Sequence, residues 1–335
     1  MSSRARLFAL LVVVCVVVAA AAIASAVRNG RATGAPEAAP TARSAFATAR
    51  AERAQLLVFR SLSRKRPKTY GQIAFAGLGS SGPARTLLPL RCERIHFAAD
   101  RGLCLARGGG FASGYRAQIL GRDLRVRDEI ALKGVPSRTR VSPDGRVGAT
   151  TFFVGGHSYA ETGSFSTQTM LIDLRRGAKI GDLEDFTVMR DGKRVRARDR
   201  NYWGVTFARD SDRFYATLAT GDRTYLVQGS VSARSGRTLH ENVECPSLSP
   251  DGSRVAYKKR VGSGTAIWRL HVLDLKTMRE TRLAESRPID DQVEWLDDAR
   301  ILYKVDEQIW SVRADGTGPS QRFQTASDSP AVVRG

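Results

Sequence analysis

Short runs in which apolar and polar residues alternate, separated by turn-forming residues, recur along most of this chain. The clearest example is Val243–Tyr257, VECPSLSPDGSRVAY, in which two such runs enclose Pro250, Asp251 and Gly252. Proline presets the backbone of a turn, aspartate bonds its own backbone, and glycine adopts conformations that other residues avoid. Alternation with a period of two on both sides of such a turn predicts a β-hairpin.

This hairpin is repeated along the chain. A second copy occurs at Ser142–Gly145, and three degenerate copies appear when the turn aspartate is used as an anchor. The five anchors, about 40 to 66 residues apart, are Asp100, Asp144, Asp210, Asp251 and Asp298. A large apolar residue stands three positions before each anchor: Phe97, Val141, Phe207, Leu248 and Trp295. Because a further strand pair follows each hairpin, the unit is four short strands, which is typical of a β-propeller blade.

The two ends of the repeated region are predicted to complete one more blade. Gln72–Gly77 and Arg85–Leu90 look like strands, and Ser329–Val333 is strand-like with no partner nearby in the sequence. Pairing them would close the ring and remove exposed strand edges. We therefore predict an all-β fold, a six-bladed β-propeller over residues 70–335, with five or seven blades as alternatives. The longest step between anchors contains Asp191–Arg200, which we expect to be a surface loop.

The first 69 residues have a different character. Residues 1–6 are a short basic start, and Leu7–Val27 is a run of 21 residues without a charge, whereas a bilayer needs roughly 20 apolar residues. Ala24–Ala26 resembles a signal-peptidase site. We therefore expect either a transmembrane anchor, the preferred interpretation, or a signal peptide cleaved after Ala26 that leaves a secreted protein. Residues 28–69 are predicted to be a linker in which Ala51–Leu62 forms a short helix.

Both interpretations place the propeller on the extracytoplasmic side, because long domains are translocated largely regardless of their charge. Net charge is +20, yet only nine of the 53 basic residues are lysine. Such an arginine excess is more typical of a GC-rich genome than of a nucleic-acid interface, so we expect no nucleic-acid partner. A basic surface could still favour the membrane or an anionic envelope polymer.

Several catalytic patterns can be tested and set aside. Gly156–Ala160, GHSYA, superficially resembles a nucleophile elbow, but it lies between predicted strands and lacks the strand–turn–helix context. The four histidines occur singly, without the spacing of metal ligands. No glycine-rich loop joins a strand to a helix as a phosphate site requires. We therefore expect no catalytic residues and no cofactor.

The repeat resembles the TolB-like propeller family, including its membrane-anchored actinobacterial members, over about residues 71–335. The matching pieces are Ser142–Gly145, Ser249–Gly252, Val272–Leu275 and Ala314–Gly318. The family contains periplasmic scaffold proteins and propellers fused to peptidases, and this chain has no room for a peptidase domain. The resemblance therefore implies a protein-interaction module of the cell envelope, which binds an envelope protein or an anionic envelope polymer, rather than an enzyme.

The strand that leads into each aspartate turn should be the innermost of its blade and line the central channel. Seven positions before the anchors stand Glu93, Ser137, Trp203, Glu244 and Asp291, with Arg138, Tyr202 and Gln292 beside them. Carboxylates that converge at a channel mouth could hold a cation or a basic peptide, although strand starts are also polar simply because water reaches them. The candidate partner-binding residues are Glu93, Arg138, Tyr202, Trp203, Glu244, Asp291 and Gln292, and no metal is assigned.

The same register predicts how deeply two of the tryptophans are buried. Trp295, three positions before its anchor, should pack between blades, whereas Trp203 should lie nearer the mouth and be partly exposed. The alternatives to a binding module are a lyase or hydrolase, or a sensor of a cation or small ligand, which would use the same channel mouth.

Three cysteines lie beyond the apolar segment: Cys92, Cys104 and Cys245. A turn centred between Asp100 and Arg101 would place Cys104 opposite Phe97. Cys92 would then lie about 16 Å away along the strand, beyond the roughly 7 Å that a disulfide spans. A bend before the strand could still bring Cys92 back, so a Cys92–Cys104 disulfide and buried free thiols both stay possible.

Overall fold

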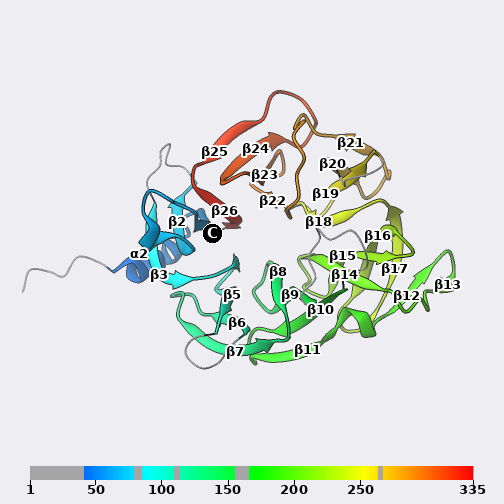
Figure 1. Cartoon of the computed structure of the whole chain (residues 1–335), viewed down its shortest axis with the longest axis horizontal. Coiled ribbons are helices and arrows are strands. Elements are labelled where there is room, and N and C mark those ends of the chain that lie inside the picture. The colour runs from blue at the N-terminus through cyan, green and yellow to red at the C-terminus, as the bar shows by residue number, and fades with distance from the viewer. Residues whose placement is uncertain (1–40, 79–84, 109–113, 155–165, 263–266, 335) are drawn as a thin grey trace, which may run out of the picture. The chain divides into compact units, whose positions relative to one another are not determined.

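A computed structural model describes residues 41–78, 85–108, 114–154, 166–262 and 267–334. Ala42–Gly335 forms one compact unit. Its described strands form six sheets arranged as the blades of a β-propeller (Figure 1). The prediction of an all-β six-bladed propeller is therefore confirmed.

The first three blades, with their strands given from the channel outwards, are four-stranded and antiparallel. Blade 1 contains β26 (Ser327–Val333), β1 (Leu56–Ser61), β2 (Gln72–Gly77) and β3 (Thr86–Arg91); blade 2 contains β4 (Arg94–Ala98), β5 (Arg101–Arg107), β6 (Tyr115–Leu120) and β7 (Val126–Leu132); blade 3 contains β8 (Val135–Val141), β9 (Val147–Val154), β10 (Ser166–Asp173) and β11 (Ala178–Asp182).

The other three blades follow in the same order around the ring. Blade 4 contains β14 (Asn201–Phe207), β15 (Arg213–Thr220), β16 (Arg223–Ser230), β17 (Ser235–Glu241), β12 (Thr187–Arg190) and β13 (Lys193–Arg194); blade 5 contains β18 (Glu244–Leu248), β19 (Arg254–Val261), β20 (Ile267–Asp274) and β21 (Glu280–Arg282); blade 6 contains β22 (Glu294–Trp295), β23 (Arg300–Val305), β24 (Gln308–Arg313) and β25 (Gln321–Gln324). Two short 3-10 helices, Pro67–Thr69 and Leu183–Asp185, connect strands.

The innermost strands are β26, β4, β8, β14, β18 and β22, and each contacts the next around the ring. The prediction that the strand before each aspartate turn lines the channel is therefore confirmed. The turns themselves follow from local chemistry. In the turn after β18, the Gly252 N–H donates to the Ser249 carbonyl at 2.9 Å, Asp251 accepts from the Ser253 N–H at 2.9 Å, and Gly252 has a φ of 77°.

Blade 1 is built from both ends of the described chain, as predicted. β26 pairs with β1 in an antiparallel register that places Leu57 opposite Val332. The expected helix over Ala51–Leu62 is wrong, however, and so is the start of the propeller at residue 70. Leu56–Ser61 is strand β1, whose main chain pairs with β2 and β26. Its side chains are almost all buried because one face packs against α2 and blade 2 and the other against blade 6.

The helix lies earlier in the chain, as α2 (Ala42–Ala51). This stretch is rich in alanine, which has the strongest helix propensity. Its buried Phe46 packs edge-on against Phe75 of blade 1 and Phe97 of blade 2, with ring centroids 5.2 and 5.3 Å away. The helix therefore belongs to the propeller unit and not to a linker.

The expected surface loop at Asp191–Arg200 also needs correction. Its first part belongs to a hairpin of β12 and β13, which turns at Asp191 and Gly192 with φ values of 50° and 75°. β12 pairs in parallel with β17, so blade 4 carries six strands. The pairing supplies partners for main-chain groups that a loop would leave to water.

Cys92 and Cys104 form a disulfide, with their Cα atoms 5.5 Å apart, and Cys245 is a buried free thiol. The register that placed Cys104 opposite Phe97 is wrong. The turn lies one residue earlier, at Ala99–Asp100, where Ala99 has a φ of 48°, so Cys104 stands opposite Ile95. The chain bends before β4, where the Cys92 N–H donates to the Gly71 carbonyl of blade 1 at 3.2 Å.

Leu7–Val27 and the GHSYA segment lie outside the described residues, so the statements on the membrane segment stay predictions. Across residues 41–334, apart from the gaps given above, no helix is long and apolar enough to cross a membrane.

Candidate functional site

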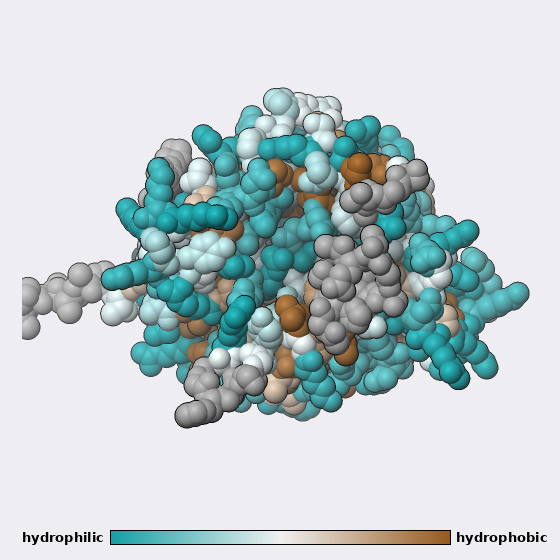
Figure 2. All heavy atoms as spheres, viewed as in Figure 1, coloured by the Kyte–Doolittle hydropathy of each residue, from teal (hydrophilic) through white to brown (hydrophobic). Residues whose placement is uncertain are grey.

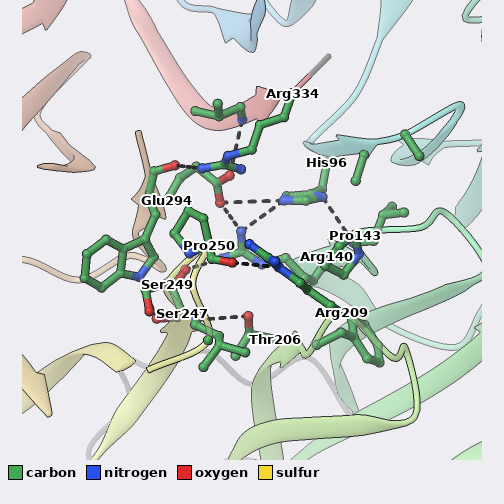
Figure 3. A pocket seen from close by; sticks show the side chains of 18 of the residues that line it. His96, Arg140, Pro143, Thr206, Arg209, Ser247, Ser249, Pro250, Glu294 and Arg334 are labelled. Atoms are coloured by element: carbon green, nitrogen blue, oxygen red, sulfur yellow. Dashed lines mark hydrogen bonds and ion pairs between the residues drawn. The ribbon is translucent and has the colours of Figure 1, made fainter. Parts of the chain in front are cut away.

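Five buried polar side chains form a layer across the channel, one from each of five innermost strands (Figure 3). Each stands four positions before an aspartate anchor. We call this layer the polar floor; it consists of His96, Arg140, Thr206, Ser247 and Glu294. β26 of blade 1 completes the ring through its main chain, because the Val332 N–H donates to Glu294 Oε1 at 3.3 Å.

Arg140 connects the members of the polar floor. Its guanidinium donates to Glu294 Oε2, to Ser247 Oγ at 3.3 Å and to the Val293 carbonyl at 2.9 Å. These bonds reach from blade 3 to blades 5 and 6. Because all three groups are buried, the pairing offsets a desolvation penalty that a lone charge could not sustain.

His96 contacts three groups of the ring. Its Nδ1 accepts from the Val141 N–H at 3.1 Å, and its Nε2 lies 3.0 Å from Arg140 Nη1 and 3.6 Å from Glu294 Oε2. Burial, together with the Arg140 charge, lowers the pKa of His96. Burial alone would raise the pKa of Glu294, but Arg140 and His96 outweigh it and lower that pKa to about 2. At neutral pH, therefore, the imidazole is neutral and the carboxylate is charged.

A cavity of about 450 Å³ opens above the polar floor, at the end of the channel where the inner strands enter their turns. We call it the turn-end pocket. Its walls include Pro143, Leu248 and Pro250 from the repeated turns. The face of the propeller drawn in Figure 2 is largely hydrophilic, with separate hydrophobic patches around its centre.

Three arginines at the rim of the turn-end pocket are held by main-chain oxygens. Arg209 Nε donates to the Pro250 carbonyl at 3.0 Å (Figure 3). Arg334 Nη2 donates to the Trp295 carbonyl at 2.6 Å, and Arg50 Nη1 donates to the Arg334 carbonyl at 3.0 Å. Within the described ranges none of these three arginines forms an ion pair. Carbonyl oxygens orient a guanidinium without neutralising its charge.

The residues predicted from the sequence lie at the other end of the channel, where the inner strands begin. Asp291 is buried between Arg94 Nη1 at 3.2 Å and Arg138 Nη1 at 3.5 Å. Burial would raise its pKa, but Arg94 and then Arg138 hold that pKa well below the usual range. Gln292 donates to the carbonyls of Val205 at 3.1 Å and Pro246 at 3.0 Å, and so links three blades.

The other two predicted carboxylates have separate basic partners. Glu244 is buried, accepts from Trp268 Nε1 at 2.9 Å and lies 3.9 Å from Lys258 Nζ. The half-exposed Glu93 lies 3.7 Å from Arg60 Nη2 and 3.3 Å from Arg107 Nε. In the part of the chain that the structure describes, no group of three or more His, Cys, Asp or Glu side chains could hold a metal ion.

The expected exposure of Trp203 is wrong. Trp203 is only 2% exposed and its neighbour Tyr202 only 1%, so neither offers much surface to a ligand. The reason is a register shift between Trp203 and Thr206 in the pairing of β14 with β15. An irregularity of this kind re-aims the side chains around it, and Gly204, with a φ of 63°, lies within it.

Comparison with known proteins gives a structural likeness only. No family model and no curated protein matches this sequence. Among solved structures, TolB from Acinetobacter baumannii shares 15% identity at a TM-score of 0.56, over 83% of this chain and 66% of that chain. This is the TolB-like six-bladed propeller fold.

A chain of a nidogen/laminin complex matches this chain at the same TM-score of 0.56, with 11% identity and with 83% of this chain and 97% of that chain covered. A putative TolB from Agrobacterium tumefaciens matches at 11% identity over 80% of this chain and 88% of that one, but its TM-score is 0.48. Identities this low establish the fold alone. The chain also spans only 66% of the Acinetobacter TolB chain that it matches.

Within this TolB-like fold, the sequence did carry a signal for the polar floor. Counting four positions back from each anchor, instead of seven, yields a histidine, an arginine, a threonine, a serine and a glutamate. His96 in RIHFA and Glu294 in VEW stand among apolar neighbours. A charged or polar residue at an otherwise apolar strand position requires a partner inside the fold, and equivalent positions of neighbouring blades can supply it.

Proposed function

We propose that this protein is a membrane-anchored, extracytoplasmic propeller that binds another protein of the cell envelope in the turn-end pocket. The observation that carries this proposal is the open cavity of about 450 Å³ at the ring centre, above a polar floor whose side chains hydrogen-bond within the fold. Ligand sites are typically concave, pre-formed and of this size. The TolB-like fold supports a protein-interaction role.

The pairing within the polar floor favours binding over catalysis. A general base needs a free lone pair within reach of the substrate proton. The lone pair of His96 at Nδ1 accepts the Val141 N–H, and Arg140 engages both Glu294 and Ser247. These groups therefore position the pocket instead of performing chemistry, which argues against a lyase or hydrolase here.

Two features support the extracytoplasmic placement. The Cys92–Cys104 disulfide is of a kind that persists in oxidising compartments and is rare in the cytosol. The apolar length of Leu7–Val27 suits a membrane anchor. Fractionation of native cells tests the second point: most of the protein should remain with the membranes. Recovery of most of it in the medium, beginning at Val27, would show a cleaved signal peptide.

Site-specific photocrosslinking in native cells tests the binding role. A photoreactive phenylalanine analogue replaces Asp100, an exposed residue that lines the turn-end pocket. The matched control replaces Val126, which is 40% exposed on the outermost strand of the same blade. We expect a discrete cross-linked protein from position 100 alone. Identical patterns from both positions, or none from either, would contradict a binding role for the pocket.

A further inference from the structure

The charge of the turn-end pocket defines a ligand class. Resting on the function proposed above, we propose that the pocket accepts a segment of the partner protein that presents a carboxylate. This is opposite to the cation or basic peptide that the acidic strand starts suggested.

The net charge of the lining is positive. It contains four arginines, Arg50, Arg140, Arg209 and Arg334, and only two carboxylates, Asp100 and Glu294. Glu294 is already paired with Arg140 in the polar floor. A pocket lined by an excess of one charge raises the local concentration of ligands of the other charge.

Donors for such a ligand are already in place. A guanidinium has five N–H donors in a planar fork that matches a carboxylate. Arg209 is exposed and uses only Nε, so within the described ranges both of its terminal nitrogens keep their donors. Arg334 uses only Nη2, towards the carbonyls of Trp295 and Leu296. Because main-chain oxygens already orient both side chains, little freedom remains to be lost when a ligand binds.

The walls favour a peptide over a charged polysaccharide. Pro143 is exposed and Leu248 and Pro250 are half-buried at the pocket surface. A peptide can place an apolar side chain against these residues and a carboxylate against Arg209 at the same time. A polysaccharide acid would satisfy the charge but would leave the apolar wall in contact with its hydroxyl groups.

The test uses the full chain in a non-ionic detergent, applied to an array of random short peptides whose carboxyl ends are either free or amidated. Acidic peptides should be enriched among those bound, and raising the salt concentration from about 0.1 M to about 1 M should weaken their binding. Enrichment among amidated peptides would assign the carboxylate to side chains. Enrichment confined to free ends would assign it to the chain terminus.

Arg209→Gln and Arg334→Gln should each weaken the binding of the best acidic peptide by about tenfold, the effect of one charge-assisted hydrogen bond. Arg209→Lys keeps the charge but not the fork and should bind with intermediate affinity. Arg313→Gln is the control, because Arg313 is exposed, pairs with Asp315 and lies outside the pocket lining. Thermal melting would verify that every variant is folded.

The outcomes separate this inference from the proposed function. Binding without a preference for acidic peptides, or with a preference for basic ones, would overturn the inference and leave the binding role intact. Binding of polygalacturonate in place of peptides would overturn the choice of a peptide. No peptide binding at all, together with failure of the crosslinking at position 100, would overturn both.

Discussion

The two ends of the channel use charge in opposite ways. Where the inner strands begin, Asp291 is buried against Arg94 and Arg138, and Glu244 lies beside Lys258. At the turn end, rim arginines such as Arg209 rest on carbonyl oxygens. The acid–base pairs at the first end serve the fold: those of Asp291 join three blades, and that of Glu244 joins two strands of one blade. The rim arginines at the second end donate their hydrogen bonds to neutral carbonyl oxygens.

Acidic residues counted along a repeat do not by themselves reveal whether their charges are free or paired. Acidic residues at corresponding positions of a repeat suggested a ligand site, yet the fold supplies each with a basic partner from another strand. Removing one partner of a buried ion pair costs much stability, so such a pair serves the structure. A charge oriented by neutral oxygens contributes little to stability, which makes it available for recognition.

The largest expected effect concerns one tryptophan from each region. Trp203→Ala and Trp295→Ala should each lower the free energy of unfolding by about 4 kcal/mol, the typical cost of removing a buried aromatic side chain. Both residues are at most 2% exposed. Urea denaturation would measure the losses, at an unchanged m-value. If Trp203→Ala proves nearly harmless, the strand-start end is more open than the structure shows.

A slightly smaller loss is expected when a buried pair at the strand-start end is broken. Asp291→Asn should cost about 3 kcal/mol, because the buried guanidinium of Arg138 and the half-buried guanidinium of Arg94 lose the carboxylate that they share. Asp297→Asn serves as the control, since its pair with Arg300 is largely exposed and such pairs contribute about 1 kcal/mol or less. Equal losses in the two variants would refute the contrast.

The polar floor should make stability depend on pH. The pKa of His96 is lowered in the folded state, so just below about pH 6.5 the unfolded chain binds a proton that the folded chain does not. Stability should therefore fall as the pH drops through this range. His96→Gln should flatten the fall, although only in part, because burial also lowers the pKa of His271. A variant with the wild-type slope would show that His96 does not contribute.

Protonation of Glu294 should also lower the stability of the fold, but at a lower pH than His96 does. The folded pKa of Glu294, about 2, lies below the unfolded value of 4.5, so its contribution is complete above pH 4.5 and is lost towards pH 2. Glu294→Gln should therefore lose stability at neutral pH and show a smaller further loss in acid.

The smallest effect is expected at the rim of the turn-end pocket. Arg209→Gln should change the free energy of unfolding by no more than about 0.5 kcal/mol, as is usual for an exposed side chain, since its hydrogen bond goes to an exposed carbonyl. Arg138→Gln, at the other end, should cost several times more. A loss at Arg209 comparable to that at Arg138 would mean that the rim serves the fold and is not reserved for a ligand.

The ring of blades was predictable because its turns are local. Pro250, Asp251 and Gly252 determine a hairpin whatever surrounds it, and the aspartate anchors therefore placed the innermost strands correctly. Strand β1 was missed because Leu56–Ser61 has no turn motif of its own and depends on β26, which lies far away in the sequence. Such pairing overrides local propensity.

The candidate site was only partly predictable. A turn displaced by one residue at Ala99 moved Cys104 away from its expected partner, and the irregularity in β14 buried Trp203. Neither shift can be read from alternation alone, because both depend on the neighbouring strand. The repeat could not predict all of the rim arginines, because Arg50 and Arg334 lie outside the repeated hairpins.

The closure of blade 1 has a consequence for dynamics. β26 and β1 must meet across more than 260 residues of sequence, and a contact of such high sequence separation forms slowly and is a natural point of local opening. Release of β26 would withdraw Val332 from Glu294 and carry Arg334 away from the rim, while the hydrogen bonds of blades 2 to 5 stayed intact. A ligand bound by both Arg209 of blade 4 and Arg334 would then hold β26 in place and stabilise its pairing with β1. Adding the ligand should therefore slow amide exchange in blade 1 more than in the other blades.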